Sequence, residues 1–237
     1  MWESQLEPHL SIGIQVNSPF RTVVVDLDDT LLASARARLR ALKAMPNLGI
    51  EPRRFAAADR RWWKVFETGG CTIEELRVGR WRDCGLTGEA ATLADTAYRS
   101  TVNSSVRQRR GARRFLLALR EAGIRTVILT NGIGPMQRSK LDESGLMPLV
   151  DGVVISAETG YSKPHPEAFN FALNLVGGTP EGAAMVGDSL EADVTGALGA
   201  GFQRVFWMTS RRPHSDPRVT SVRHLDEALG PLTNGWR

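Results

Sequence analysis

The chain has 237 residues, of which 42% are hydrophobic and 24% charged, so it can bury a sizeable core and is not intrinsically disordered. Its formal charge of +4 comes largely from dispersed arginines, without the long basic run of a nucleic-acid tail, and favours an anionic substrate. The only two cysteines, Cys71 and Cys84, lack C-x-x-C spacing and His neighbours, which excludes a disulfide framework or zinc site and favours a reducing cytoplasm.

Residues 1–21 are predicted to form a polar N-terminal extension that contains Pro8 and Pro19. The segment lacks the basic start and apolar block of a signal peptide. No stretch of the chain reaches the roughly 18 apolar residues of a membrane helix, so no membrane partner is expected.

Short apolar runs then alternate with helical patterns. The predicted strands occupy residues 22–27, 124–130, 152–156, 183–187 and 204–208. Their near-continuous apolarity indicates strands that are buried on both faces. The intervening segments have helical spacing and several end in glycine. This alternation predicts an α/β fold with a Rossmann-like, doubly wound parallel sheet as its core.

Residues 33–109 break the alternation, because they contain helix-forming stretches rich in Ala, Arg, Glu and Trp but no convincing strand. We interpret them as an inserted helical module. The core is then divided into a first part, residues 22–32, and a second part, residues 110–237. Ligands of doubly wound sheets bind beyond the carboxyl ends of the strands, so the insertion is expected to lie above the site.

The first strand ends in two acids, Asp26 and Asp28, which lie on the same side of an extended segment. One carboxylate can attack phosphorus while the other exchanges a proton with the leaving oxygen. The pair could equally be an Asp-rich turn in which the side chains bond their own backbone.

Three further segments follow predicted strands in chain order. Thr-Asn-Gly at 130–132 could hold phosphate oxygens or form a simple turn. Lys163 could neutralise gathered negative charge or be a solvated loop residue. Asp188, with Asp193 five residues later, could provide oxygen ligands for magnesium or begin a helix.

The four segments together resemble the motifs of the haloacid dehalogenase superfamily, and the resemblance spans about residues 22–229. It implies that Asp26 is the nucleophile and Asp28 the acid/base. Mg²⁺ would be held by Asp26, Asp188 and the backbone carbonyl of Asp28. Asp193 matches the second acid, which supports the metal or the lysine.

The same resemblance implies a phosphate site. Thr130 and Lys163 would bind the transferred phosphoryl group, while Asn131 and Gly132 would line the site. Thr30 would brace the first loop. These assignments describe a phosphatase that works through an aspartyl-phosphate intermediate.

The insertion resembles the mobile α-helical cap of the family's subclass I. Within it, residues 60–86 are similar to the caps of pyrimidine 5′-nucleotidases and N-acylneuraminate phosphatases; the matching positions are Trp63, Glu67, Gly69, Arg80 and Trp81. Arg80 is therefore expected to bind a polar group of the substrate's leaving portion. Alternatively, these Trp and Arg side chains serve packing of the cap.

The predicted function is hydrolysis of a small phosphorylated metabolite, either a nucleoside monophosphate or a sugar phosphate. The segment at 130–146 is also similar to the nucleotidase group, which favours a nucleoside monophosphate without excluding a sugar phosphate. A phosphomutase of the β-phosphoglucomutase type shares all the motifs and stays an alternative. A 2-haloacid dehalogenase is disfavoured, because its first motif lacks the second carboxylate, Asp28. A nucleic-acid-binding module built on Arg-Arg-Trp-Trp-Lys at 60–64 would leave the motifs unexplained, so no nucleic-acid partner is expected. The sequence indicates no oligomeric state.

Overall fold

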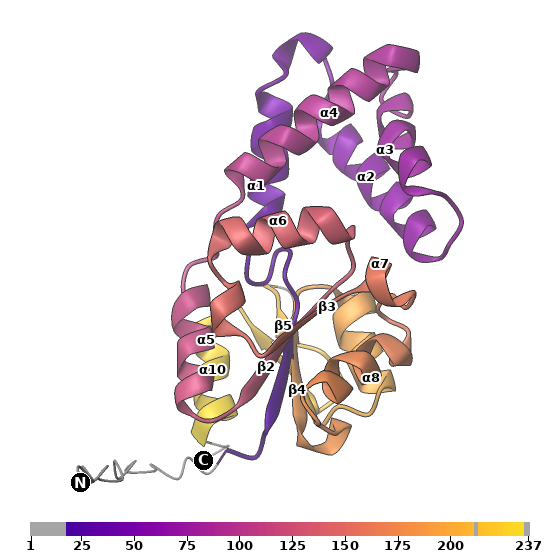
Figure 1. Ribbon diagram of the computed structural model, residues 1–237. Helices are drawn as coiled ribbons and strands as arrows, with labels where there is room; N and C mark the ends of the chain where they lie inside the picture. The colour runs from indigo at the N-terminus through magenta and orange to yellow at the C-terminus, as the bar shows by residue number, and fades with distance from the viewer. Residues whose placement is uncertain (1–17, 211–212, 235–237) are drawn as a thin grey trace, which may run out of the picture.

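A computed structural model of the chain describes residues 18–210 and 213–234, so most of the predicted N-terminal extension lies outside the described residues (Figure 1). Six strands of the described chain form one sheet in the order β3-β2-β1-β4-β5-β6, and every neighbouring pair is parallel. This confirms the predicted doubly wound sheet. The strands are β1 (Thr22–Val25), β2 (Arg125–Thr130), β3 (Gly152–Ile155), β4 (Ala183–Gly187), β5 (Arg204–Met208) and β6 (Val219–Val222).

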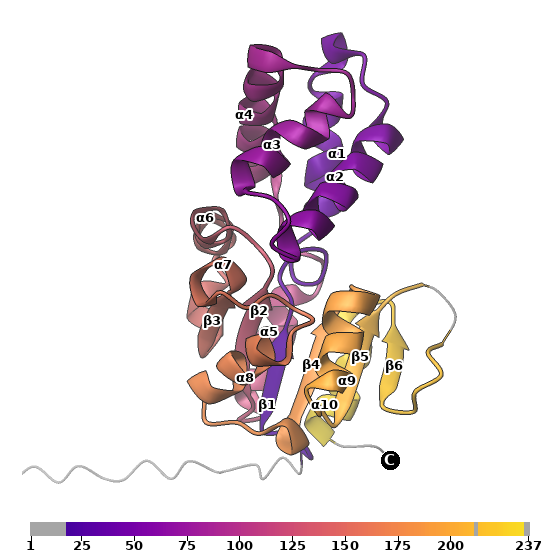
Figure 2. The same cartoon turned by 90° about the vertical axis from the view of Figure 1, so that its right-hand side faces the viewer.

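Helices cover both faces of the sheet, with α5 and α10 on one side and α8 and α9 on the other (Figure 2). Alternate residues of β1 enter opposite cores, because successive side chains of a strand point to opposite faces. Val23 and Val25 contribute to one core and Val24 to the other. The helices of this part are α5 (Ala112–Glu121), α6 (Gly134–Ser144), α7 (Ser156–Thr159), α8 (Pro166–Leu175), α9 (Gly196–Gly199) and α10 (Leu225–Asn234).

The sixth strand, β6, was not predicted from the sequence. Among the described strands it pairs only with β5, at the edge of the sheet, and its burial pattern places Val219 and Val222 inside and the two residues between them half-exposed. Its four residues, Val-Thr-Ser-Val, lack the continuous apolar run that marked the central strands. A strand at the edge of a sheet has a neighbour on one edge and solvent on the other, so it needs fewer apolar residues than a central strand.

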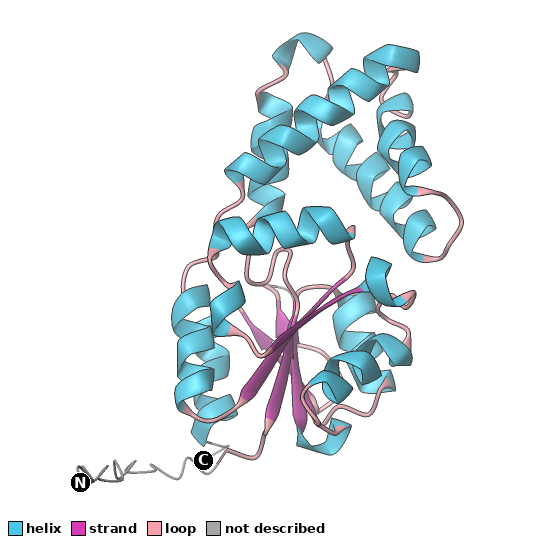
Figure 3. Ribbon diagram, in the orientation of Figure 1, coloured by secondary structure: helices cyan, strands magenta, loops and turns pink. Residues whose placement is uncertain are grey.

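The residues between β1 and α5 form a separate group of helices, drawn without any strand arrow in Figure 3. These helices are α1 (Ser34–Lys43), α2 (Pro52–Glu67), α3 (Ile73–Arg82) and α4 (Gly88–Ser105). A capping box between Thr72 and Glu75 begins α3. We call α1–α4 the cap; its predicted boundaries, residues 33–109, stay a prediction.

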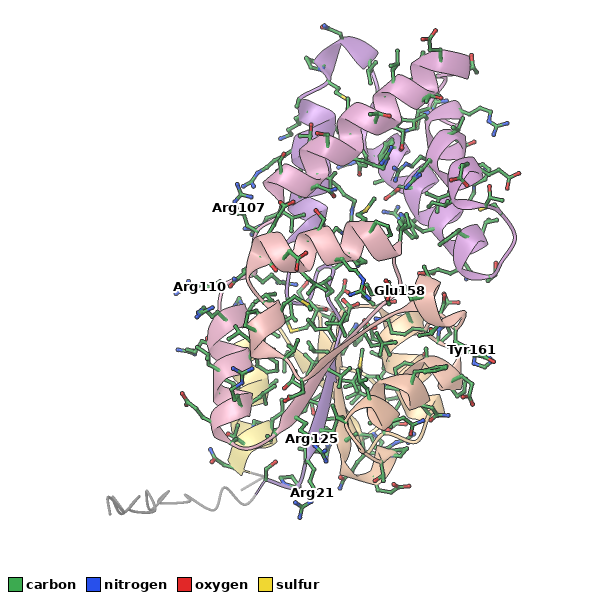
Figure 4. The ribbon with its side chains drawn as sticks, viewed as in Figure 1. Arg21, Arg107, Arg110, Arg125, Glu158 and Tyr161 are labelled. Atoms are coloured by element: carbon green, nitrogen blue, oxygen red, sulfur yellow. The ribbon has the colours of Figure 1, made fainter. Side chains whose placement is uncertain are left out.

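The cap is joined to the sheet domain by two chain segments that lie side by side. Leu32, which enters the cap, forms an antiparallel bridge with Gln108, which leaves it. The amide of Ala33 donates a 2.9 Å hydrogen bond to the carbonyl of Arg107, which Figure 4 labels at this junction. The two connections therefore support each other at the base of the cap.

None of the helices within residues 18–210 and 213–234 is long and apolar enough to cross a membrane. Cys71 and Cys84 are both free thiols, and Cys84 is buried. The predicted cytoplasmic location stays a prediction.

Candidate active site

The predicted site residues follow three neighbouring strands at the centre of the sheet. Asp26 follows β1, Thr130 ends β2 and Asp188 follows β4. Lys163 reaches the same point from the loop before α8. Parallel strands point their carboxyl ends to one edge, which explains why residues so far apart in the chain meet there.

Lys163 is the centre of this group. Its ammonium lies 2.7 Å from a carboxylate oxygen of Asp26 and 2.7 Å from one of Asp193, and only 2% of its side chain is exposed. Burial alone would lower the pKa of Lys163, but the two carboxylates raise it above its usual value. The ammonium therefore stays charged beside Asp26, where it can neutralise a phosphoryl oxygen.

Asp26, Asp188 and Asp193 form a carboxylate cluster whose nearest oxygens all lie within 4.8 Å of one another. Burial raises the pKa of Asp26 well above its usual range, and the negative charges of Asp193 and Asp188 add to this rise. Burial, together with the charge of Asp193, raises the pKa of Asp188 to about 7. Such mutual repulsion is relieved by a cation, and the cluster could hold a metal ion.

The hydrogen bonds of the cluster distinguish its members. Both oxygens of Asp193 are occupied, one by Lys163 and the other by the amide of Ser189 at 2.9 Å. The second oxygen of Asp26 is buried and has no hydrogen-bond partner among the described residues. A buried carboxylate oxygen without a donor fits a cation, so Asp26 and Asp188 suit metal binding while Asp193 holds Lys163.

Asn131 connects three parts of the site. Its side-chain amide donates to the carbonyl of Lys163 at 2.7 Å and to Glu67 of α2 at 3.0 Å. Its oxygen accepts from the amide of Lys163 and from the hydroxyl of Ser156, both at 2.8 Å. This geometry makes Asn131 a brace of the lysine loop and a contact to the cap; its predicted place in the phosphate site stays a prediction.

The carboxylate of Asp28 is bonded by two side chains of α6 that the sequence analysis did not identify. Lys140 lies 2.8 and 2.9 Å from the two carboxylate oxygens, and the Gln137 amide donates to one of them at 2.8 Å. The Ser34 hydroxyl, at the start of the cap, also donates to Asp28. Burial alone would raise the pKa of Asp28, but Lys140 and the hydrogen bonds lower it well below its usual range.

Gln137 also donates to the hydroxyl oxygen of Thr130, at 2.6 Å. Because Thr130 accepts this bond, its own hydrogen stays free to donate to a phosphoryl oxygen. Gly132 makes room for the amide, since a Cβ at this position would lie 2.6 Å from Gln137 side-chain carbons. The only signal for Gln137 in the sequence is its place five residues after Thr-Asn-Gly.

Thr30 is fully buried, and its hydroxyl has no hydrogen-bond partner among the described residues. Its predicted bracing role stays a prediction. The loop also contains Asp29, whose backbone adopts a left-handed φ of 65°. The Asp29 carboxylate accepts from the amide of Ala35 at 2.6 Å and pairs with Arg38 at 2.6 Å.

Arg80 lies inside the cap, with 5% of its side chain exposed. Its guanidinium bonds Asp59 at 2.7 Å and Asp95 at 2.6 Å, and it lies over the rings of Phe55 and Tyr98. Two of its three nitrogens are therefore bonded within the cap, while Nε has no hydrogen-bond partner among the described residues. This geometry favours the packing alternative, and the predicted substrate contact stays a prediction.

A cavity of about 760 Å³ lies between the cap and the strand ends. Both parts of the chain line it: Trp63, Arg77 and Tyr98 from the cap, and Asp28 and Lys163 from the sheet domain. The cavity has the size of a small-molecule site and opens directly onto the residues just described.

Residues 20–201 match the family described as haloacid dehalogenase-like hydrolase. The chain belongs to this family. The hydrolase is 30% identical over 207 residues to N-acylneuraminate-9-phosphatase of Homo sapiens, covering 81% of this chain and 83% of the relative. It is 32% identical over 238 residues to ribulose-1,5-bisphosphate 5-phosphatase of Halopiger xanaduensis, covering 90% of this chain and 97% of the relative.

A solved structure agrees with the same assignment. The HAD-hydrolase YfnB of Bacillus subtilis, bound to magnesium, superposes on this hydrolase with a TM-score of 0.78 and 26% identity, covering 90% of this chain and 98% of the other. The family match and the phosphatase relatives confirm the predicted enzyme class. This hydrolase is a phosphoric monoester hydrolase.

Proposed function

We propose that the chain is a magnesium-dependent phosphatase that hydrolyses a small phosphorylated metabolite through an aspartyl-phosphate on Asp26. The observation that carries the proposal is the state of the Asp26 carboxylate. One oxygen is bonded by the buried Lys163, and the other is buried without a partner beside Asp188. An arrangement of this kind suits a nucleophile that works between two cations.

In the first step, Asp26 forms a bond to phosphorus while the bond from phosphorus to the leaving oxygen breaks. Lys163 and the hydroxyl of Thr130 hold the equatorial oxygens of the phosphoryl group. Asp28, whose protonated form is favoured by the negative charge of the bound phosphate, supplies a proton to the leaving alkoxide. In the second step, Asp28 removes a proton from the water that attacks the aspartyl-phosphate, which releases inorganic phosphate and restores Asp26.

Asp26, Asp188 and the backbone carbonyl of Asp28 would hold the magnesium ion, with Asp193 keeping Lys163 in place. When bound, the ion would supply positive charge against the phosphoryl oxygens and the repelling carboxylates. Oxygen donors without His or Cys agree with magnesium rather than zinc.

The substrate's leaving portion would occupy the cavity between the cap and the strand ends. Its volume of about 760 Å³ supports a small metabolite, and the relatives named for N-acylneuraminate 9-phosphate and ribulose 1,5-bisphosphate support a sugar phosphate over a nucleoside monophosphate. A phosphomutase would use the same residues and differ only in the acceptor of the phosphoryl group.

A screen of phosphate release tests the proposal. The purified chain, with added Mg²⁺, is incubated with sugar phosphates, nucleoside monophosphates and phosphorylated acids. We expect release from one class and loss of at least about 10³-fold in kcat for Asp26→Asn, since the amide is not a nucleophile. Mass spectrometry of the variant excludes deamidation back to Asp. Conversion of a sugar phosphate into its isomer without phosphate release would favour the phosphomutase, and full turnover by Asp26→Asn would contradict the assignment of the nucleophile.

A further inference from the structure

Lys140 is a lysine of α6 with only 6% of its side chain exposed. Lysine is rarely buried unless a carboxylate compensates its charge. Its partner here is Asp28, which it meets at 2.8 and 2.9 Å with both carboxylate oxygens. The contact therefore fixes the plane of the carboxylate as well as its position.

Gln137, one turn earlier on α6, ties this carboxylate to the phosphate site. Its amide nitrogen lies 2.8 Å from Asp28 and 2.6 Å from the hydroxyl of Thr130. One donor group thus sets the separation of two side chains that come from different strands. A carboxylate fixed relative to Thr130 is also fixed relative to any phosphoryl group that Thr130 binds.

The helix that carries both residues is itself anchored. Arg138 pairs with Glu158 of α7 at 2.6 Å, and Figure 4 labels Glu158 beside α6. At the other end, Gln108, which follows the cap, donates to the carbonyl of Ser144 at 2.6 Å. In Figure 1, α6 lies between the cap and the sheet, so its two side chains reach the site from a fixed support.

We propose that Lys140, assisted by Gln137, is a positioning residue that holds the Asp28 carboxylate where it exchanges a proton with the leaving oxygen. The inference rests on the proposed function and adds Lys140, which acts through Asp28, and Gln137, which bonds both Asp28 and Thr130. Among the described residues, the ammonium of Lys140 bonds only the two carboxylate oxygens of Asp28. Its removal should therefore impair the steps in which Asp28 moves a proton and spare the attack of Asp26 on phosphorus.

Two substrates separate these steps. An alkyl phosphate, such as the best substrate of the screen, needs a proton on its leaving oxygen, whereas p-nitrophenyl phosphate releases a stable phenolate without one. The ratio kcat/KM covers binding and formation of the aspartyl-phosphate but excludes its later hydrolysis. A comparison of kcat/KM on both substrates thus isolates leaving-group protonation.

We expect Lys140→Met to lower kcat/KM for the alkyl phosphate by at least about tenfold, since general acid catalysis contributes about 10²–10⁴-fold. The loss on p-nitrophenyl phosphate should be within about threefold, because no proton is needed there. Lys140→Arg retains a cation that can bond both oxygens and should recover part of the activity. Lys43→Met, at an exposed lysine at the end of α1, is the matched control and should change neither value.

A double variant gives a second readout. If Lys140 acts through Asp28, then Lys140→Met should add no loss to Asp28→Asn on the alkyl phosphate. In the Asp28→Asn variant, position 28 carries no charge, so removing Lys140 leaves no unpaired carboxylate buried there. The double variant therefore remains informative if Lys140→Met alone folds poorly. Equal losses of Lys140→Met on both substrates, or additive losses in the double variant, would overturn the inference. The proposed function fails separately, if the wild-type chain releases no phosphate from any monoester.

Discussion

Two buried sets of charges in the described residues each hold one cation between two carboxylates. Lys163 lies between Asp26 and Asp193 at the strand ends, and Arg80 lies between Asp59 and Asp95 in the cap. Removing one member of such a set lowers the free energy of unfolding by more than the whole set contributes to it. The reason is that the remaining charge stays buried without compensation.

Arg80→Met should therefore destabilise the protein by about 3 kcal/mol, because Asp59 loses its bonded cation inside the cap. Thermal unfolding measures the change. kcat/KM should fall to a similar extent on the best substrate and on p-nitrophenyl phosphate. Arg82→Met, at an exposed arginine of the same helix, is the control and should leave the melting temperature nearly unchanged. An unchanged melting temperature combined with a loss confined to the best substrate would instead support the predicted substrate contact.

Among the individual site residues, those that follow buried strands could be predicted from the sequence, because the ends of such strands can be located from the apolar runs. Asp26, Thr130 and Asp188 belong to this group. The partners of Asp28 could not be predicted in the same way, because Gln137 and Lys140 follow a helical pattern in which polar residues usually face solvent. Arg80 could be placed in the cap but not between its carboxylates, which lie 21 and 15 residues away in the chain.

Among the elements, α2 and α3 pack so closely that a glycine is required at their contact. A Cβ on Gly79 of α3 would overlap the ring of Trp62 on α2. The indole of Trp62 also donates a 2.8 Å hydrogen bond to Asp83, just after α3. Both contacts fix the relative position of these helices, which carry Trp63 and Arg77 on the cavity wall.

Gly79→Ala should thus destabilise the protein by about 1–3 kcal/mol through overpacking, although alanine favours a helix by about 1 kcal/mol. The free energy of unfolding in urea measures the outcome. Gly199→Ala in α9 is the matched control, because a Cβ at this exposed position meets no atom within 4 Å. We expect that variant to be neutral or slightly stabilised. Equal effects of the two substitutions would contradict the assigned packing of α2 against α3.

The regular elements were predictable to different degrees. The central strands are buried on both faces and carry continuous apolar runs, so residues 183–187 and 204–208 were predicted with the bounds found in the structure. At β3 the predicted strand, 152–156, is one residue longer than the observed Gly152–Ile155. The edge strand β6 was missed because its central Thr-Ser pair is half-exposed and breaks the apolar run.

For the molecule as a whole, the carboxylate cluster predicts that metal binding and stability are linked. A cation that binds only the folded chain stabilises it by about 2.7 kcal/mol at a hundredfold excess over its Kd. Added Mg²⁺ should raise the melting temperature of the wild-type chain, and excess chelator should abolish turnover.

Asp188→Asn should lose most of this Mg²⁺-dependent shift, because the substitution removes a charged ligand from the site. Asp142→Asn, at an exposed acid of α6, is the control for the loss of one negative charge and should retain the shift. The metal site would have to be placed elsewhere if both variants respond to Mg²⁺ like the wild-type chain.

The paired backbone at the base of the cap, where Leu32 bridges Gln108, also bears on how such an enzyme evolves. Because the chain departs and returns through adjacent hydrogen bonds, the cap is joined covalently to the sheet domain as a closed loop, and its other contacts, such as Glu67 with Asn131, involve side chains. Segments of other lengths could be exchanged at this junction without shifting the register of β1 against its neighbours. Recombination at this junction would place different caps over the same active site, and each new cap could admit a different substrate.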